Sequence, residues 1–327
     1  MSALAIEASE EVETAEVEAS AGDEDNALTN KAVVAIEAEA ETETETETTD
    51  AEELPRNFAI AGMGSGGDTD GAEYESLASM WNTELGNDGS KAGEWYDKAA
   101  AWWADEKNCP ATIDGVLGGF GFLDYVDIDE STKFLLEILL MEQTGSNNRM
   151  GRQRALDCGA GIGRITKHLL RKFFGITDLV EGNQRLLDEV PRFMASGAKV
   201  SNYKGDVGEL FCCTLQDCEP KEAFYDCIWV QWVVIYLTDR DFISFLQRCA
   251  RGLRPGGMII IKENILSLSS EDDFLVDKDD SSLTRSKAYM ERIFEKAGMV
   301  IVRDTRQKNF PEDMFPVWTW ALQPRKT

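Results

Sequence analysis

The sequence RALDCGAGIGRIT, residues 154–166, runs from an apolar segment through three glycines into a segment with helical spacing. The apolar half predicts a buried strand, and the glycines predict a sharp turn at which the backbone can approach a ligand closely. The helix that follows, predicted to extend to Phe174, would present its positively polarised N-terminus to the same ligand. The stretch therefore predicts a binding cradle but does not by itself identify the ligand.

From Arg154 onward, apolar runs and helical patterns alternate, which is typical of a doubly wound parallel sheet. Strands are predicted over residues 154–158, 177–181, 211–215, 226–233 and 258–262, and helices over 163–174, 184–194, 239–252 and 283–297. Residues 299–304 and 315–322 are expected to close the sheet as an antiparallel hairpin. The predicted fold class is α/β and Rossmann-like, with a mostly parallel, doubly wound sheet of seven strands.

The N-terminal part of the chain differs in composition from the rest. Residues 1–53 contain 18 acidic residues and one Lys, so they carry −17 of the net charge of −27 and leave −10 to the remainder. Their low complexity, together with the glycines of residues 62–67, predicts a disordered acidic tail and a flexible linker over residues 1–73. Order is expected to begin near Tyr74.

A helical cap is expected over residues 74–150, in front of the sheet and within one domain that covers residues 74–327. Its first helix is predicted from Tyr74, Leu77, Met80 and Trp81, which are spaced as one helix face. Two further helices are predicted at residues 93–105 and 131–141, and Ser131 is interpreted as the N-cap of the last. An apolar loop with four glycines, residues 110–121, is interpreted as either a lid or a tight turn.

The composition also excludes classes of function. The acidic balance argues against general nucleic-acid binding, which needs a basic surface. The seven cysteines show no C-x-x-C spacing, so no zinc site, other metal site or disulfide framework is predicted, and a reducing compartment is favoured. No apolar run approaches the ~20 residues that span a bilayer, and no signal-peptide pattern precedes the acidic tail. A cytoplasmic or nuclear location, without a membrane partner, is therefore expected.

Three polar residues around the glycine turn narrow the choice of ligand. The spacing Gly159-x-Gly161-x-Gly163 differs from the G-x-G-x-x-G of dinucleotide enzymes, and NAD(P) is the alternative ligand at this point. Glu181 ends the second predicted strand, where a carboxylate can accept hydrogen bonds from a ribose. Asp157 suits an amine, and Arg164 can pair with a carboxylate. A ligand that combines a ribose, an amine and a carboxylate is S-adenosylmethionine.

Several further blocks resemble one family, the alpha-N-terminal protein methyltransferases. The resemblance extends from about Trp95 to Leu322, and its blocks are LDCGAGIGRITK (156–167), IWVQWV (228–233), LTD (237–239), TIDGVLGG (112–119), LQD (215–217), IIKEN (260–264) and DSS (280–282). It implies a class I methyltransferase fold, S-adenosyl-L-methionine as cofactor, and methylation of the α-amino group of proteins that begin Xaa-Pro-Lys after removal of the initiator Met.

The same resemblance implies roles for individual residues. Cofactor binding would fall to Gly159, Gly161, Arg164, Glu181, Gly182, Asn183, Leu215, Gln216 and Gln231. Substrate binding would fall to Leu117, Gly118, Trp103, Trp232, Asp277 and Phe315, with Trp232 stacking on the second-position Pro and Asp277 receiving the third-position Lys. Catalysis would involve Asp280, Asn264 and Tyr236.

The sequence departs from the family at three places. Tyr236 stands where animal relatives commonly have His, and because the phenol has a pKa of about 10 it is a poor base, so Asp280 becomes the expected proton acceptor. Phe315 stands where Tyr is usual. Residues 204–210 resemble an insertion and are interpreted as a surface loop. Two alternatives remain at this point: a methyltransferase for a small molecule, and a scaffold that binds N-termini. The sequence predicts no oligomeric state.

Overall fold

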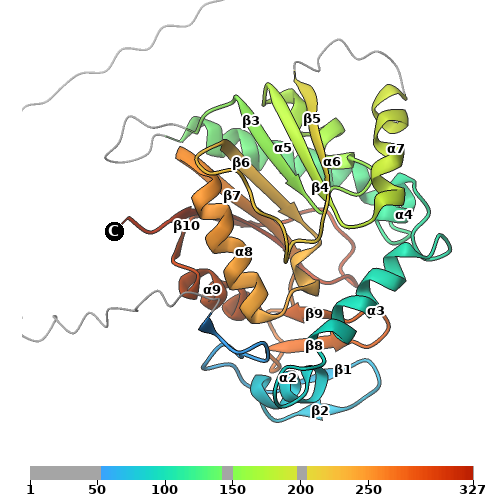
Figure 1. The fold of residues 1–327 in the computed structure, drawn as a ribbon, viewed down its shortest axis with the longest axis vertical. Coiled ribbons are helices and arrows are strands. Elements are labelled where there is room, and N and C mark those ends of the chain that lie inside the picture. The colour runs from blue at the N-terminus through green and yellow to red at the C-terminus, as the bar shows by residue number, and fades with distance from the viewer. Residues whose placement is uncertain (1–52, 142–149, 197–204, 327) are drawn as a thin grey trace, which may run out of the picture. The chain divides into compact units, whose positions relative to one another are not determined.

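The computed structural model describes residues 53–141, 150–196 and 205–326. The disordered tail predicted for residues 1–52 lies outside this part of the chain. A seven-stranded sheet forms the centre of the fold, with strand order β10-β11-β7-β6-β3-β4-β5 (Figure 1). Its strands are β3 (Arg154–Cys158), β4 (Ile176–Glu181), β5 (Asp206–Cys212), β6 (Tyr225–Gln231), β7 (Leu253–Asn264), β10 (Met299–Arg306) and β11 (Val317–Pro324).

The pairing directions confirm the predicted fold class. β5, β4, β3, β6 and β7 run parallel to one another, and β11 and then β10 are added antiparallel at the β7 edge. All seven residues of β6 are buried, as expected for a central strand that is covered on both faces. The sheet is therefore mostly parallel and ends in an antiparallel C-terminal hairpin.

Alternate residues of the central strands face two separate cores, because successive strand side chains point to opposite faces. Leu156, Ile228 and Ile259 face the core that contains α8 (Asp239–Gly252) and α9 (Lys287–Lys296). Trp229 and Ile260 face the core that contains α5 (Asp124–Leu140) and α6 (Arg164–His168). In Figure 1, α8 lies in front of the sheet and α5 behind it. The remaining helical elements are α2 (Leu77–Leu85), α3 (Ala92–Ala104), α4 (Ile113–Val116), α7 (Gln184–Ala195) and the 3-10 turns η2 (Gly121–Leu123), η3 (Leu170–Lys172) and η4 (Val234–Tyr236).

A second, four-stranded sheet was not predicted, and it corrects the expectation of a linker. β1 (Gly66–Asp68) and β2 (Glu73–Tyr74) form a hairpin, and β1 pairs in parallel with β8 (Phe274–Asp277), which pairs with β9 (Ser282–Arg285). A Cβ atom on Gly66 would lie 2.4 Å from the carbonyl oxygen of Phe274. The glycine therefore permits close approach of two strands, and the interpretation of residues 62–67 as a flexible linker is wrong.

Three other predicted boundaries are wrong for identifiable reasons. α5 begins at Asp124, so Ser131 lies inside the helix and is no N-cap. β5 covers residues 206–212, so most of the predicted surface insertion is a strand. It lies exposed at the sheet edge, and the charged residues and glycine of its first half are typical of a loop. Leu283 belongs to β9, and α9 begins after the N-cap Ser286.

The described residues contain no helix that is both long enough and apolar enough to cross a membrane. The same part of the chain holds no group of three or more His, Cys, Asp or Glu side chains placed to bind a metal ion. All seven cysteines are free thiols.

Candidate active site

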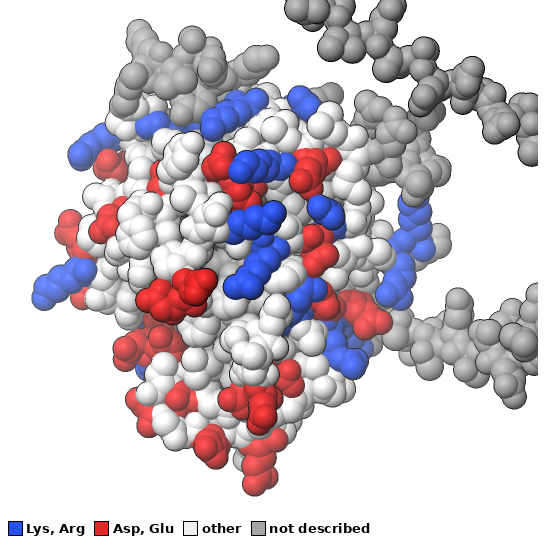
Figure 2. All heavy atoms as spheres, turned by 180° about the vertical axis from the view of Figure 1, so that it is seen from behind, with Lys and Arg blue, Asp and Glu red and all other residues white. Residues whose placement is uncertain are grey.

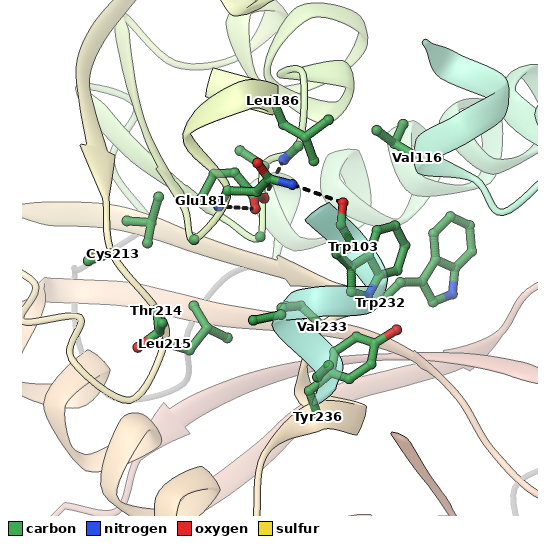
Figure 3. A pocket seen from close by; sticks show the side chains of 18 of the residues that line it. Trp103, Val116, Glu181, Leu186, Cys213, Thr214, Leu215, Trp232, Val233 and Tyr236 are labelled. Carbon is green, nitrogen blue, oxygen red and sulfur yellow. Dashed lines mark hydrogen bonds between the residues drawn. The ribbon is translucent and has the colours of Figure 1, made fainter. Parts of the chain in front are cut away.

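A cavity of about 400 Å³ opens at the carboxyl ends of β3, β4 and β6 (Figure 3). Ligands of open α/β sheets bind at this edge, where loops from neighbouring strands converge. The cavity is lined by the glycine turn and by the segments Glu181–Asn183, Leu215–Gln216 and Gln231–Trp232. Helix α3 contributes Trp103, and η4 contributes Tyr236. The structure thus brings every residue predicted to bind the cofactor to one cavity.

The glycine turn owes its shape to three left-handed residues. Gly159, Gly161 and Gly163 have φ angles of +69°, +54° and +83°, which L side chains rarely adopt. A Cβ on Gly159 would also lie 2.8 Å from the side chain of Val233. The amides of Gly159 and Ala160 both donate to the carbonyl of Val180, which ties the turn to β4. The first glycine therefore cannot be replaced without moving the cavity wall.

Glu181 connects the turn to the loop that follows β4. Its Oε2 accepts the amide of Gly161 at 2.8 Å, and its Oε1 accepts the amide of Asn183 at 2.9 Å. Burial raises the pKa of Glu181. Asn183 in turn donates from Nδ2 to the carbonyl of Trp103, which joins this loop to α3. Because each carboxylate oxygen can accept more than one hydrogen bond, Glu181 retains capacity for a ribose at the cavity wall.

A Glu181→Gln variant should bind S-adenosylmethionine about tenfold more weakly, because hydrogen bonds to a charged group contribute more than neutral ones. The amide nitrogen would also face one of the two backbone N–H groups that the carboxylate now accepts. Isothermal titration calorimetry measures the change. Asp188→Asn, an exposed position on α7, is the matched control and should bind like the wild type. Equal dissociation constants for Glu181→Gln and wild type would refute the assignment.

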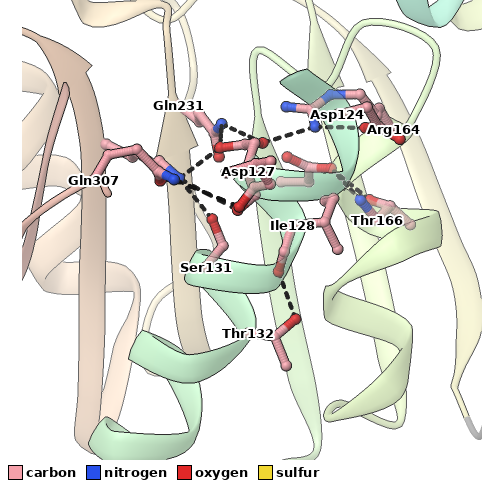
Figure 4. A network of polar contacts seen from close by, with 12 residues as sticks. Asp124, Asp127, Ile128, Ser131, Thr132, Arg164, Thr166, Gln231 and Gln307 are labelled. Atoms are coloured by element: carbon pink, nitrogen blue, oxygen red, sulfur yellow. Dashed lines mark hydrogen bonds and ion pairs between the residues drawn. The ribbon is translucent and has the colours of Figure 1, made fainter. Parts of the chain in front are cut away.

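A buried polar network lies behind the cavity (Figure 4). Asp127 of α5 accepts Arg164 Nη1 at 2.7 Å, Gln231 Nε2 at 3.0 Å and Lys262 Nζ at 2.5 Å. Lys262 also donates to Ser131 Oγ at 2.8 Å and to Gln307 Oε1 at 2.7 Å. Arg164 and Gln231 both line the cavity. One buried carboxylate therefore orients two of the groups that face the cofactor.

Sequence reasoning missed Asp127 and its partner Lys262. Burial alone would raise the pKa of Asp127, but the charges of Lys262 and Arg164 outweigh it and hold that pKa below its ordinary value. A signal was present in the sequence: Lys262 follows the apolar run of residues 258–261 on a central strand, and a buried cation requires an anionic partner. The partner could not be named, because residue 127 was assigned to no helix.

Asp157 lies in the cavity wall below the turn. Its Oδ2 accepts the backbone amide of Thr166 at 2.9 Å and the Thr166 hydroxyl at 2.6 Å. Burial raises the pKa of Asp157 to about 6, so the group is mainly ionised at neutral pH. At the part of the cavity lined by Leu215 and Gln216, Arg248 Nη2 donates to the carbonyls of these two residues at 2.8 and 2.9 Å, which fixes the loop after β5.

Tyr236 connects the cavity to the turn between β8 and β9. Its hydroxyl donates to Asp280 Oδ2 at 3.0 Å, and its ring stands edge-on to Trp103 at a centroid distance of 6.1 Å. Burial raises the pKa of Tyr236 well above its ordinary value, so the phenol stays protonated and acts as a donor. Burial also raises the pKa of Asp280. A carboxyl group from β8–β9 is thus held against a side chain that lines the cavity.

Trp232 leaves β6 in a strained conformation. Its φ of +54° is unusual for a bulky residue, and its amide donates to the carbonyl of Lys262. Its ring lies in the cavity wall beside Trp103 (Figure 3). Strain of this kind persists only where surrounding structure over-determines the residue, as at functional sites.

The other predicted substrate residues lie outside the cavity lining. Leu117 is buried after α4, and Gly118 follows it with a φ of +59°. Asp277 and Asp280 occupy the β8–β9 turn, and Phe315 is exposed at a separate hollow formed by residues 306–317. Asn264 ends β7, where its backbone N–H donates to Glu263 Oε1 at 2.9 Å. Burial raises the pKa of Glu263 to about 8, so that neighbouring carboxyl is mostly protonated at pH 7.

Comparison with known proteins places the chain among methyltransferases. The sequence profile of the AdoMet-dependent proline di-methyltransferase family matches residues 91–323. This chain belongs to that family. The N-terminal Xaa-Pro-Lys N-methyltransferase 1-A of Xenopus laevis is 40% identical over 243 residues, which cover 74% of this chain and 100% of the relative. The alpha N-terminal protein methyltransferase 1 of Arabidopsis thaliana is 38% identical over 265 residues, or 79% of this chain and 90% of the relative.

A solved structure gives the same result. A SAM-dependent methyltransferase of Leishmania major superimposes with a TM-score of 0.68 at 39% identity, covering 80% of this chain and 96% of its own. The class I methyltransferase fold, the enzyme class and S-adenosylmethionine dependence predicted from sequence are therefore confirmed.

The residues present fit S-adenosylmethionine. The cavity combines a carboxylate for a ribose at Glu181, a guanidinium for a carboxylate at Arg164 and a second carboxylate for an amine at Asp157. A side chain at position 159 would collide with Val233. Glycine at this position therefore keeps the cavity open. These groups come from β3, from the turn and helix that follow it, and from the end of β4.

Proposed function

We propose that this protein methylates the α-amino group of proteins whose mature N-terminus reads Xaa-Pro-Lys. The names of the Xenopus and Arabidopsis relatives, each covered over at least nine-tenths of its length, support this substrate. The structural observation that carries the proposal is the hydrogen bond from Tyr236 to Asp280, which brings an acidic turn to the cofactor cavity. A small-molecule methyltransferase would have no use for that turn, whereas a peptide with a basic third residue would.

The chemistry suits an N-terminal amine. An α-amine has a pKa of about 7.7–8.0, so a useful fraction is neutral near pH 7, whereas a lysine side chain at about 10.4 is almost fully protonated. S-adenosylmethionine supplies an electrophilic methyl group when bound. The roles of the chain are to align the amine with that methyl group and to receive the proton that the amine loses.

Two carboxyl groups, those of Glu263 and Asp280, act electrostatically on Tyr236 at the cavity. Their protonation states differ, so we give them different roles. Glu263 is mostly protonated at neutral pH, because its pKa is raised to about 8. Asp280 accepts hydrogen bonds from Tyr236 and from the amide of Ser282, which favour its ionised form. We assign Asp280 as the proton acceptor, Tyr236 as the donor that orients it, and Asn264 as a neutral group that orients the amine. Trp232 would stack on the Pro, and Asp277 would pair with the Lys.

The surface around the turn matches a basic N-terminal tail. Figure 2 shows that Asp and Glu predominate at the end of the molecule that β1, β2 and α2 form in Figure 1. Asp70, Glu73 and Glu75 are exposed there.

The free state of all seven cysteines supports a reducing compartment, and we propose the cytoplasm or nucleus as the location.

Synthetic peptides that begin Ala-Pro-Lys or Ser-Pro-Lys should gain methyl groups on the terminal nitrogen when incubated with the protein and cofactor. Mass spectrometry counts the added methylene units, up to three on a primary amine and two on an N-terminal Pro, and fragmentation locates them. N-acetylated peptides are the control and should remain unchanged, because they lack the basic amine. Methylation of an internal Lys, or no transfer to any of these peptides, would overturn the proposal. Cofactor binding without transfer would favour the scaffold alternative.

A further inference from the structure

The turn between β8 and β9, residues 277–280, is held by a part of the chain that precedes the family match. The family profile begins at residue 91, but β1, β2 and α2 lie between residues 66 and 85. β1 pairs with β8 in parallel, with Gly66 opposite Phe274 and Asp68 opposite Val276. Beyond the strand, Thr69 donates its amide to the carbonyl of Val276 at 3.0 Å. The hydroxyl of the same Thr accepts the amide of Lys278 at 2.9 Å, so the contact extends into the turn itself.

The side chain of Lys278 is held by the same segment. Lys278 is the cation within the otherwise acidic sequence Asp-Lys-Asp-Asp of the turn. Its Nζ lies 2.6 and 2.7 Å from the two carboxylate oxygens of Glu84, on α2. The hydroxyl of Tyr74 lies 3.0 Å from Glu84 Oε1 and 2.9 Å from Asp68 Oδ2, which joins β1, β2 and α2 in one cluster. The side chains of Glu84 and Lys278 are 11% and 27% exposed, so solvent screens this pair only in part.

The electrostatic consequence concerns a basic substrate. A free ammonium in the turn would repel a substrate lysine or compete with it for Asp277 and Asp280. Two lysines contact the turn, and neither contact is to a carboxylate of the turn: Lys278 pairs with Glu84, and Lys98 of α3 donates to the carbonyl of Lys278. The carboxylates of the turn are therefore left to an incoming cation. The proposed function requires this arrangement, whereas cofactor binding does not, because none of these residues lines the cavity.

We propose that residues 66–85, outside the region shared with the family profile, position the residue 277–280 turn and neutralise its lysine, and so determine affinity for the basic third residue of the substrate. The inference rests on the proposed function for the identity of the substrate. The positioning of the turn itself rests only on the contacts above.

The decisive comparison is Glu84→Ala against the double variant Glu84→Ala/Lys278→Ala. Glu84→Ala should raise KM for an Ala-Pro-Lys peptide about fivefold, the range expected for one partly screened charge, with kcat and the cofactor Kd unchanged. Removing the freed lysine in the double variant should return KM to within about twofold of the wild type. The charge-matched control is Glu75→Ala. Glu75 is exposed, and the structure gives it no contact with Lys278. An Ala-Pro-Gln peptide should respond to none of these variants.

A second variant tests the backbone contact without using activity. Gly66→Val would place a Cβ 2.4 Å from the carbonyl oxygen of Phe274 and separate β1 from β8. Hydrogen exchange at the amides of residues 274–285 should then become faster, while cofactor Kd stays the same. Unchanged exchange in this variant, or a double variant as impaired as Glu84→Ala, would overturn the inference. If the wild type methylates no Xaa-Pro-Lys peptide, the proposed function fails, and the exchange measurement still decides whether the segment positions the turn.

Discussion

An Asp280→Asn variant should lose about two to three orders of magnitude in kcat and bind S-adenosylmethionine like the wild type, because a positioned proton acceptor contributes about 10²–10⁴ in rate. The amide keeps the size of the side chain and can still accept from Tyr236, but it cannot take a proton. Asp280 lies outside the cofactor cavity lining, which is why binding should be unaffected. Single-turnover methylation of an Ala-Pro-Lys peptide measures the loss.

The pH dependence of the wild type tests the same assignment. Burial raises the pKa of Asp280, so its carboxylate form is lost at a higher pH than for an exposed aspartate. The kcat of the wild type should therefore fall as pH decreases through this raised pKa, and the residual activity of Asp280→Asn should lack that fall. Asp279→Asn removes the same charge from an exposed position in the same turn and should retain most of the activity. Equal losses in the two variants would show that only the charge of the turn matters.

An Asp127→Asn variant should be destabilised by about 3–5 kcal/mol, the usual cost of breaking a buried ion pair from one side. Arg164, Gln231 and Lys262 all donate to this carboxylate, and an amide offers one acceptor atom and a nitrogen that would face donors. Arg164 and Lys262 would keep their charges in a buried site without the shared anion. Urea unfolding followed by circular dichroism measures the change in free energy.

Asp129→Asn on the same helix provides the control for this second variant. Asp129 pairs with Lys133, and both side chains are about half exposed, so its loss should cost less than about 1 kcal/mol. Because the pKa of Asp127 is held low, its contribution to stability is present above the unfolded-state pKa and is lost as pH falls through the folded value. If both variants unfold at the same urea concentration as the wild type, the network has no structural role.

Local signals in the sequence were sufficient for the cofactor half of the molecule. The strand, the glycine turn and the helix at residues 154–168 are contiguous, and Glu181 ends the next strand of a fold whose strand ends converge. Gln231 could be singled out because an amide in an apolar strand needs partners. These residues meet because the carboxyl ends of the parallel strands converge at one edge of the sheet. The parallel sheet itself is predicted by the alternation of strands and helices from Arg154 onward.

Features that depend on distant pairing could not be predicted. The partner of Lys262 lies 135 residues earlier on α5, in a stretch that was not assigned to a helix. β1 and β2 are only three and two residues long, and the two glycines of β1 resemble those of a linker until its pairing with β8 is known. β5 lies at the edge of the sheet, and Asp206, Gly208 and Glu209 interrupt the apolar pattern of its first half, so only its last residues resemble a strand in the sequence.

The pairing of β1 with β8 also bears on how the protein matures. The pairing joins residues that lie 208 positions apart in the sequence, such as Gly66 and Phe274. We expect contacts of such separation to form late, because the intervening chain must first be ordered. The cofactor cavity draws its lining from residues no later than Leu237, so a chain emerging from the ribosome contains all of it before β8 appears. The N-terminal segment is made first, and we expect it to dock late, once β8 is available. On this order the chain would acquire the lining of its cofactor cavity before the turn that receives the substrate is held in place.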